Sequence, residues 1–391
     1  MAADQKNLPR SKEKTSLYET LGIKLFHYHA KRCLKDPVYS KDLSDAEILE
    51  HSKKITALSY VTAFIVGALS AAGSAVTELS FPENSCMEVF SYPCFEKYAW
   101  VLAITLLLTI LEFAVLIWMS IYTVFHLSLL IGHGDQLYPE DTLIHLPNLL
   151  SRAALEIPDP VRHILGIDPF QKISKKKLFI IGIFYKLKVI LSNILAKLIL
   201  RRVIGKSALR VGTNFIAVPI TGLWNSAVLY KVTREAKLRL FGNLLAKHLA
   251  EQITEQSLSC LSPKAKLCCL QSVGNSIVLT QKYHPNMLIL MIRLLDVIEY
   301  DRSENLDDWD QFVKNFHSLT AAEKRLIMDL LSIAAAFDGK FSKLEKEKLS
   351  DIFQEYSESY YDKIRNMTGL MYSGQIHRAK EECNLHLPPE K

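Results

Sequence analysis

The sequence predicts an all-α membrane protein, made of a transmembrane helical hairpin, membrane-associated amphipathic helices and a cytosolic helical bundle. Two long uncharged runs, recurring helix start signals in the C-terminal part and the lack of an alternating strand pattern lead to this prediction. The chain has 391 residues, 49% of them hydrophobic, which gives room for two or three domains and excludes a disordered protein.

The first 54 residues are a predicted cytosolic helical region. They contain 11 lysines and arginines, and no apolar run precedes Lys53 and Lys54, so no cleavable signal peptide is expected. Ser44 and Glu47 have the spacing of a capping box, which predicts that a helix begins there.

The first predicted span is Ile55–Thr77, where 23 consecutive residues carry no charge. This length is enough to cross a bilayer core of about 30 Å. Small residues recur at every fourth position along it: Ala63, Gly67, Ala71 and Ala75. Such a face allows the backbone of another helix to approach closely.

The second predicted span begins near Tyr98, in an uncharged run that reaches Ile131 and is interrupted only by Glu112. About 20 residues suffice to span, so the span is placed at 98–120 and the remainder is expected to project beyond the bilayer. A carboxyl group near mid-membrane is a functional candidate. The alternative, favoured here, is that Glu112 meets a polar neighbour and serves only helix association.

Lysine and arginine counts set the orientation of this hairpin, 55–131. The loop 78–97 contains only Lys97, whereas the regions before and after the hairpin are basic, so both termini are predicted to be cytosolic. The loop also holds Cys86 and Cys94, which could form a disulfide in an oxidising compartment.

The middle of the chain is strongly basic. Residues 151–240 contain 17 lysines and arginines against four acids, which indicates a face on anionic lipid headgroups. Aromatic residues do not alternate with the basic ones, so nucleic acid is not an expected partner. The region divides into a proline-punctuated linker, 132–177, and membrane-associated or re-entrant helices, 178–235.

Within that region, Val211–Tyr230 is uncharged and long enough to span. Basic residues flank it on both sides, against the positive-inside bias. Pro219 and Gly222 permit a break, so a re-entrant or buried helical hairpin is an alternative to a third span. The sequence leaves the choice open.

The runs IPDP, GIDPF and SKKK, followed by AVPITGLWNSAVL and TREAKLRLFG, resemble a family of predicted bacterial multi-pass membrane proteins. The resemblance extends over about residues 40 to 390. The family has no assigned reaction, so the resemblance implies only the class of protein and its location in the cell inner membrane.

The last region, 236–391, is predicted to be a helical bundle. Ser262 precedes Pro263 at one helix start, and Thr320 with Glu323 forms a capping box at another. The helix that follows carries its apolar residues on one face, namely Leu326, Leu330, Ile333 and Phe337.

The stretch FDGKFSKLE, residues 337–345, looks like half of a calcium-binding loop. With Gly339 at the sixth position of such a loop, the first and third positions fall on Ala334 and Ala336, which cannot coordinate calcium. A helix-turn-helix joint explains the residues better, with Ser342 and Glu345 as the next capping box.

Residues 319–353, with their alanine-rich helix, DG turn and S-x-x-E start, resemble the TerB-like domain associated with tellurite resistance. The resemblance implies a helical, cytosolic module for partner binding or metal stress.

No nucleotide-binding, hydrolase or metalloprotease motif occurs in the chain, so no catalytic residue and no cofactor is predicted. Two groups of potential ligands, His27, His29 and Cys33 in one and Glu47 with His51 in the other, have too weak a pattern to predict a metal. Cys268 and Cys269 lie in an apolar helix and are expected in the core.

These observations favour a membrane-anchored, non-enzymatic interaction or stress-response protein. Its expected partners are the bilayer, an unidentified protein that binds the bundle, and a second copy of the chain. The alternative is a small transporter or channel component that uses Glu112.

Overall fold

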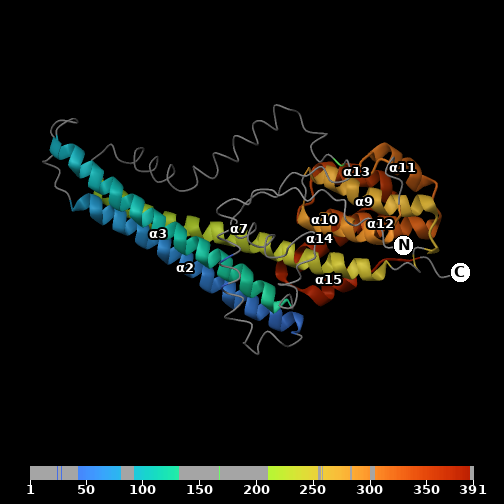
Figure 1. Ribbon diagram of the computed structural model, residues 1–391, viewed down its shortest axis with the longest axis horizontal. Coiled ribbons are helices and arrows are strands. Elements are labelled where there is room, and N and C mark those ends of the chain that lie inside the picture. Colours follow the sequence, from blue (N-terminus) through green and yellow to red (C-terminus); the bar gives the residue numbers. More distant parts are fainter. Residues whose placement is uncertain are drawn as a thin grey trace.

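The computed structural model describes residues 43–80, 92–131, 210–253, 259–281, 284–299 and 304–387, with four isolated positions besides. Every regular element in these residues is a helix, so the all-α prediction is confirmed. Three long helices form an elongated array, and shorter helices form a bundle at one end of it (Figure 1). The three are α2 (Asp45–Leu79), α3 (Tyr92–Leu130) and α7 (Arg210–Gln252).

Helix α2 begins at the predicted capping box. The Ser44 side chain accepts from the Glu47 amide, and the Glu47 carboxylate accepts from the Ser44 amide at 2.9 Å. The helix then continues for 35 residues, through the boundary expected after residue 54 and past the end of the predicted span. Its first turns therefore extend the span on the side of the bundle.

Helix α3 has 39 residues and is longer than the predicted span 98–120 at both ends. At a rise of 1.5 Å per residue it is about 58 Å long, well beyond one bilayer core. Its C-terminal part is buried in protein: Ile121, Val124 and Phe125 pack with Val232 and Ala236 of α7. Among the described residues, length and composition alone single out α2 and α3 as helices that could cross a membrane.

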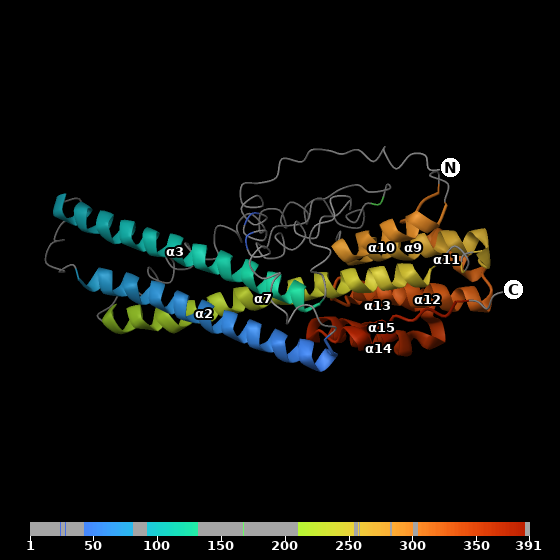
Figure 2. The ribbon, with the colours of Figure 1, turned by 60° about the horizontal axis from the view of Figure 1, so that its bottom comes forward.

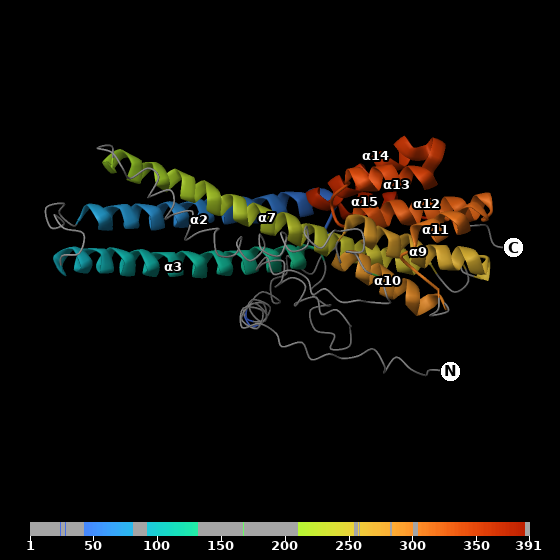
Figure 3. The ribbon, with the colours of Figure 1, turned by 90° about the horizontal axis from the view of Figure 1, so that it is seen from above.

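Helix α7 runs without interruption for 43 residues, although Pro219 lies inside it. The break that Pro219 and Gly222 would permit, left open as an alternative by the sequence, therefore does not occur. Proline removes one intrahelical hydrogen bond, and packing against α2 holds the helix together across this position. The second half of α7 leaves the array and becomes the central helix of the bundle (Figure 3), so the boundary drawn at residue 235 falls inside one helix.

The bundle surrounds this second half of α7 with shorter helices (Figure 2). These are α9 (Pro263–Thr280), α10 (Pro285–Val297), α11 (Trp309–His317), α12 (Ala321–Ala336), α13 (Lys343–Phe353), α14 (Ser357–Ser373) and α15 (Ile376–Glu382). The predicted N-caps Ser262, Thr320 and Ser342 all cap their helices.

The bundle core is apolar and continuous. The predicted face of α12 is buried along its whole length, and Cys268 and Cys269 lie fully inside. Burial raises the pKa of both thiols to about 12, so neither is a reactive nucleophile in the folded protein.

Candidate functional site

The predicted small-residue face of α2 packs against α7. A Cβ on Gly67 would collide with the Asn225 side chain and lie 2.9 Å from the Thr221 carbonyl oxygen. A Cβ on Gly222 would likewise lie 2.9 Å from the carbonyl oxygen of Phe64. The two glycines thus bring the backbones of α2 and α7 together. Ala63 and Ala75 are buried and Ala71 is half-buried, as such a face requires.

Glu112 lies beside this crossing and is 2% exposed. Its Oε1 accepts a hydrogen bond of 2.8 Å from Nδ2 of Asn225 on α7. The polar neighbour expected for Glu112 is therefore Asn225, and the pair joins α3 to α7. Sequence reasoning did not single out Asn225, although an amide in a twenty-residue uncharged run was a signal for it.

Further polar contacts join the same three helices on the side of the bundle. Ser59 of α2 and Thr123 of α3 share a hydrogen bond of 2.6 Å. The Ser226 hydroxyl of α7 donates to the Tyr60 carbonyl at 2.9 Å. These contacts lie between the helices, so each hydroxyl has its partner inside the helix array.

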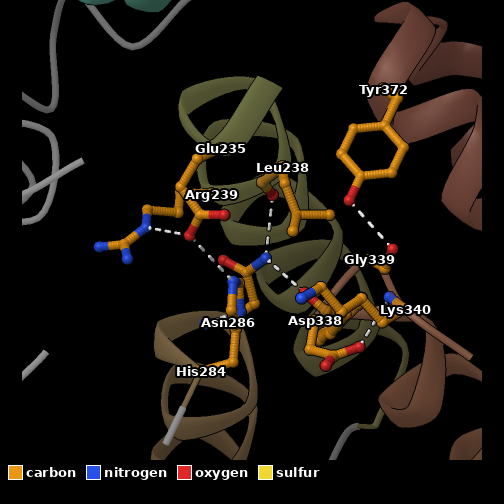
Figure 4. A network of polar contacts seen from close by, with 10 residues as sticks. Glu235, Leu238, Arg239, His284, Asn286, Asp338, Gly339, Lys340 and Tyr372 are labelled. Carbon is orange, nitrogen blue, oxygen red and sulfur yellow. Dashed lines mark hydrogen bonds and ion pairs between the residues drawn. The ribbon is translucent and has the colours of Figure 1, made fainter. Parts of the chain in front are cut away.

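A second polar cluster lies where α7 enters the bundle (Figure 4). Nδ2 of Asn286, in the first turn of α10, donates to the carbonyl oxygens of Leu238 at 2.9 Å and Phe337 at 3.1 Å. Gly242 makes room for this amide, because a Cβ there would collide with it. One side chain thus joins α7 to α10 and to the end of α12.

Charged groups of α7 surround the same point. Glu235 Oε1 lies 2.8 Å from Arg239 Nε and 3.7 Å from His284 Nε2. Burial would raise the pKa of the Glu235 carboxyl, but the neighbouring His284 and the Arg239 charge outweigh it, so the pKa lies well below its usual range. The carboxylate is therefore a fixed negative charge in the joint.

The DG turn at 338–339 is part of this joint and faces α7. Gly339 has a φ of +70°, as expected for a turn glycine, and Lys340 N donates to Asp338 Oδ1 at 2.8 Å. The Tyr372 hydroxyl of α14 donates to the Gly339 carbonyl at 3.0 Å. The Arg234 guanidinium of α7 lies 4.1 Å from the centre of the Tyr372 ring.

Helix α2 has its own joint with the bundle. Oδ1 and Oδ2 of Asp45 accept from the backbone amides of His377 and Arg378, at 3.0 and 3.2 Å, in the first turn of α15. Ile48, one turn further along, is 4% exposed and belongs to the bundle core. Both α2 and α7 therefore enter the bundle as rigid helices.

The remaining predicted positions add no chemistry to these clusters. Glu47 serves as a helix cap, and His51 Nδ1 contacts the Glu47 carbonyl at 3.1 Å. Cys94 falls in the first turn of α3, and Cys86 lies outside the described residues, as do His27, His29 and Cys33. Within the part of the chain that the structure describes, no group of three or more acids, histidines and cysteines is arranged to hold a metal.

Comparison of the chain with protein-family models, curated proteins and solved structures finds no match.

Proposed function

We propose that this chain is a membrane-anchored, non-enzymatic interaction protein that holds a helical domain in a fixed orientation at the cytosolic face of the cell inner membrane. The observation that carries the proposal is the continuity of α7, which belongs to the helix array in its first half and to the bundle core in its second. A flexible tether would leave the bundle free to rotate; a continuous helix fixes it.

The surface of the array supports membrane placement. Large apolar side chains of α2 are exposed from Leu58 to Leu79, and those of α3 from Trp100 to Trp118. At 1.5 Å per residue, each stretch is about 30 Å long, which is the thickness of a bilayer core. Monomeric soluble proteins rarely expose an apolar surface of this extent to water.

The bundle offers a different surface. Among its described residues, Tyr356 is the one exposed large apolar side chain, at 52%. It lies between exposed polar residues of α13 and α14, and tyrosine is among the residues enriched at protein interfaces. The resemblance of residues 319–353 to TerB-like modules is consistent with a role in partner binding or stress response.

The pairing of Glu112 with Asn225 supports helix association over transport. An amide and a carboxyl that bind each other across an interface need no further ligand to explain why they lie in the membrane.

Two experiments test the proposal. First, membranes are washed with alkaline carbonate; we expect the chain to stay in the pellet, and its release as a soluble protein would contradict membrane anchoring. Second, a photo-cross-linking residue replaces Tyr356, with Leu106 on α3 as the matched lipid-facing control. We expect a discrete protein adduct from the bundle position and none from Leu106.

A protein adduct of equal yield from both positions would show that the capture is not specific to the bundle. Cross-linkers at the exposed positions Glu358 and Arg365 extend the search over α14. No adduct from any of the three bundle positions would contradict a partner on this face.

A further inference from the structure

We infer that the first half of α7, Val211–Tyr230, is a further membrane crossing that runs antiparallel to α2 and begins level with its outer end. The inference rests on the proposed membrane placement of α2 and α3, and it identifies the lipid acyl chains as the partner of the outer face of α7.

The contact register gives the direction of α7. Gly67 of α2 lies against Thr221, and Tyr60, two turns nearer the bundle, accepts a hydrogen bond from Ser226. A step toward the bundle along α2 is thus matched by a step up the numbering of α7. Helix α7 runs parallel to α3, since Asn225 contacts Glu112 and Leu229 packs near Leu116.

The length of α7 gives its reach. From Asn225 back to Arg210 the helix extends about 22 Å, at 1.5 Å per residue. From Gly67 to Leu79, α2 extends about 18 Å in the same direction. Two views agree that the start of α7 lies beside the outer part of α2 (Figures 2 and 3).

The surface chemistry of α7 changes where the array is expected to leave the bilayer. Ile220, Leu223 and Trp224 are 44–63% exposed, like the lipid-facing residues of α2 and α3. Tyr230 is the last exposed large apolar residue along α7, and its ring lies 6.0 Å from that of Tyr60 on α2. Tyrosines at one level on two helices are typical of a membrane–water interface.

Basic side chains lie on the bundle side of these tyrosines. Lys231 and Arg234 are exposed on α7, and Lys53 and Lys54 are exposed on α2. Burial and the nearby Lys53 ammonium lower the pKa of Lys237, which places these two lysines near each other across the two helices. The cytosolic edges of α2 and α7 therefore coincide.

The end of α3 and the start of α7 lie at opposite ends of the helix array. Ile131 packs against the bundle core, whereas α7 begins at the far end of the array. In the inferred arrangement, residues 131 and 210 therefore lie on opposite sides of the bilayer. Arg210 then lies on the outer side, which the positive-inside bias of loops disfavours. The packing of α7 on α2 outweighs this bias here.

Cysteine accessibility in intact cells tests this crossing. The parent variant has Cys33, Cys86, Cys94 and Cys260 replaced by serine and keeps the three buried cysteines, whose pKa burial raises to about 12. Into it are placed, one at a time, Ser80→Cys at the end of α2, Val211→Cys or Thr213→Cys at the start of α7, and Lys340→Cys in the bundle. A membrane-impermeant maleimide is applied before and after permeabilisation.

We expect both α7 positions to be labelled in intact cells as strongly as Ser80→Cys, and Lys340→Cys to be labelled only after permeabilisation. If Ser80→Cys is labelled from outside but both α7 positions need permeabilisation, α7 does not cross and the hairpin anchor stands. If Ser80→Cys also needs permeabilisation, the orientation of the hairpin fails, and with it the proposed function. Two α7 positions are used so that one misfolded variant, recognised by its melting temperature in detergent, does not decide the result.

Discussion

The first half of α7 turns large apolar side chains outward, whereas the second half turns them inward. Leu223 is 63% exposed and Trp224 49%, but Phe241, Leu245 and Leu249 are at most 2% exposed. This difference fits the inferred placement, with lipid around the first half of α7 and the bundle core around the second half.

The two halves are also held by different forces. In a bilayer, lipid is as apolar as leucine, so helices associate through close backbone packing and polar pairs, as at Gly67, Gly222 and Asn225. In the bundle, burial of apolar surface is the main stabilising term, at roughly 25 cal/mol per Å². Substitutions that add volume at the close contacts should therefore disrupt the first half, whereas substitutions that remove buried groups should disrupt the second.

The largest effect is expected at the glycine crossing. A side chain at Gly222 must displace the backbone of Phe64, so Gly222→Leu should lower the free energy of unfolding by about 3 kcal/mol or more. Thermal unfolding of the purified protein in detergent measures it. Gly73→Leu is the matched control, since its nearest neighbour is the flexible Leu108 side chain at 3.0 Å. Equal destabilisation by both variants would contradict a specific crossing at Gly222.

A smaller loss is expected at the joint between α7 and the bundle. Asn286→Leu keeps the size of the side chain but removes both hydrogen bonds to the Leu238 and Phe337 carbonyls, which should cost on the order of 2 kcal/mol. The same unfolding assay measures the loss. Hydrogen exchange should also become faster in the DG turn and in the middle of α7, and unchanged exchange at both places would show that Asn286 does not couple them.

A pH-dependent effect is expected next. Burial, with the Asp338 charge nearby, raises the pKa of Glu345 from 4.5 to about 7, although hydrogen bonds from Ser342 oppose the rise. A raised pKa means that the folded state holds the proton more tightly. The contribution to stability is thus complete below pH 4.5 and lost as the pH rises through 7, by roughly 1–3 kcal/mol.

Glu345→Gln carries no titrating group and should remove this slope. Unfolding free energies at pH 5 and pH 8 should then differ less for the variant than for the parent chain. A parallel pair of pH profiles would show that Glu345 is ionised in the folded protein throughout this range.

The smallest effect is expected at the cap of α13. The Ser342 hydroxyl accepts from the Glu345 amide at 3.2 Å, so Ser342→Ala should cost about 1 kcal/mol.

Because Ala334 and Ala336 supply no oxygen ligand from their side chains, calcium should leave the melting temperature unchanged. A calcium-dependent rise that Glu345→Gln abolishes would show a metal site in this turn.

Local signals predicted much of this fold. The caps at Ser44, Thr320 and Ser342 and the small-residue face around Gly67 depend on residues a few positions apart, and the structure has them as predicted. The partners of the small-residue face and of Glu112 could not be predicted, because they lie far away in the sequence. Glu112 and Asn225, for example, are 113 positions apart.

At Pro219, tertiary contacts override a local sequence preference. That preference is for a break in the helix, but tertiary packing of Gly222 on Phe64 holds α7 continuous. The two joints with the bundle were missed for a related reason, since Asp45 and Asn286 resemble ordinary helix-start residues until the helices that they contact are known.

We propose that the helix array and the bundle form one rigid unit through α7. Spin labels at Leu106→Cys on α3 and Glu358→Cys on α14, in the serine background described above and reconstituted in lipid nanodiscs, test it by double electron–electron resonance. A single narrow distance distribution is predicted, and one that broadens when Asn286→Leu is added. A broad distribution in the unmodified joint would mean that the bundle moves freely on the membrane helices and would contradict the account.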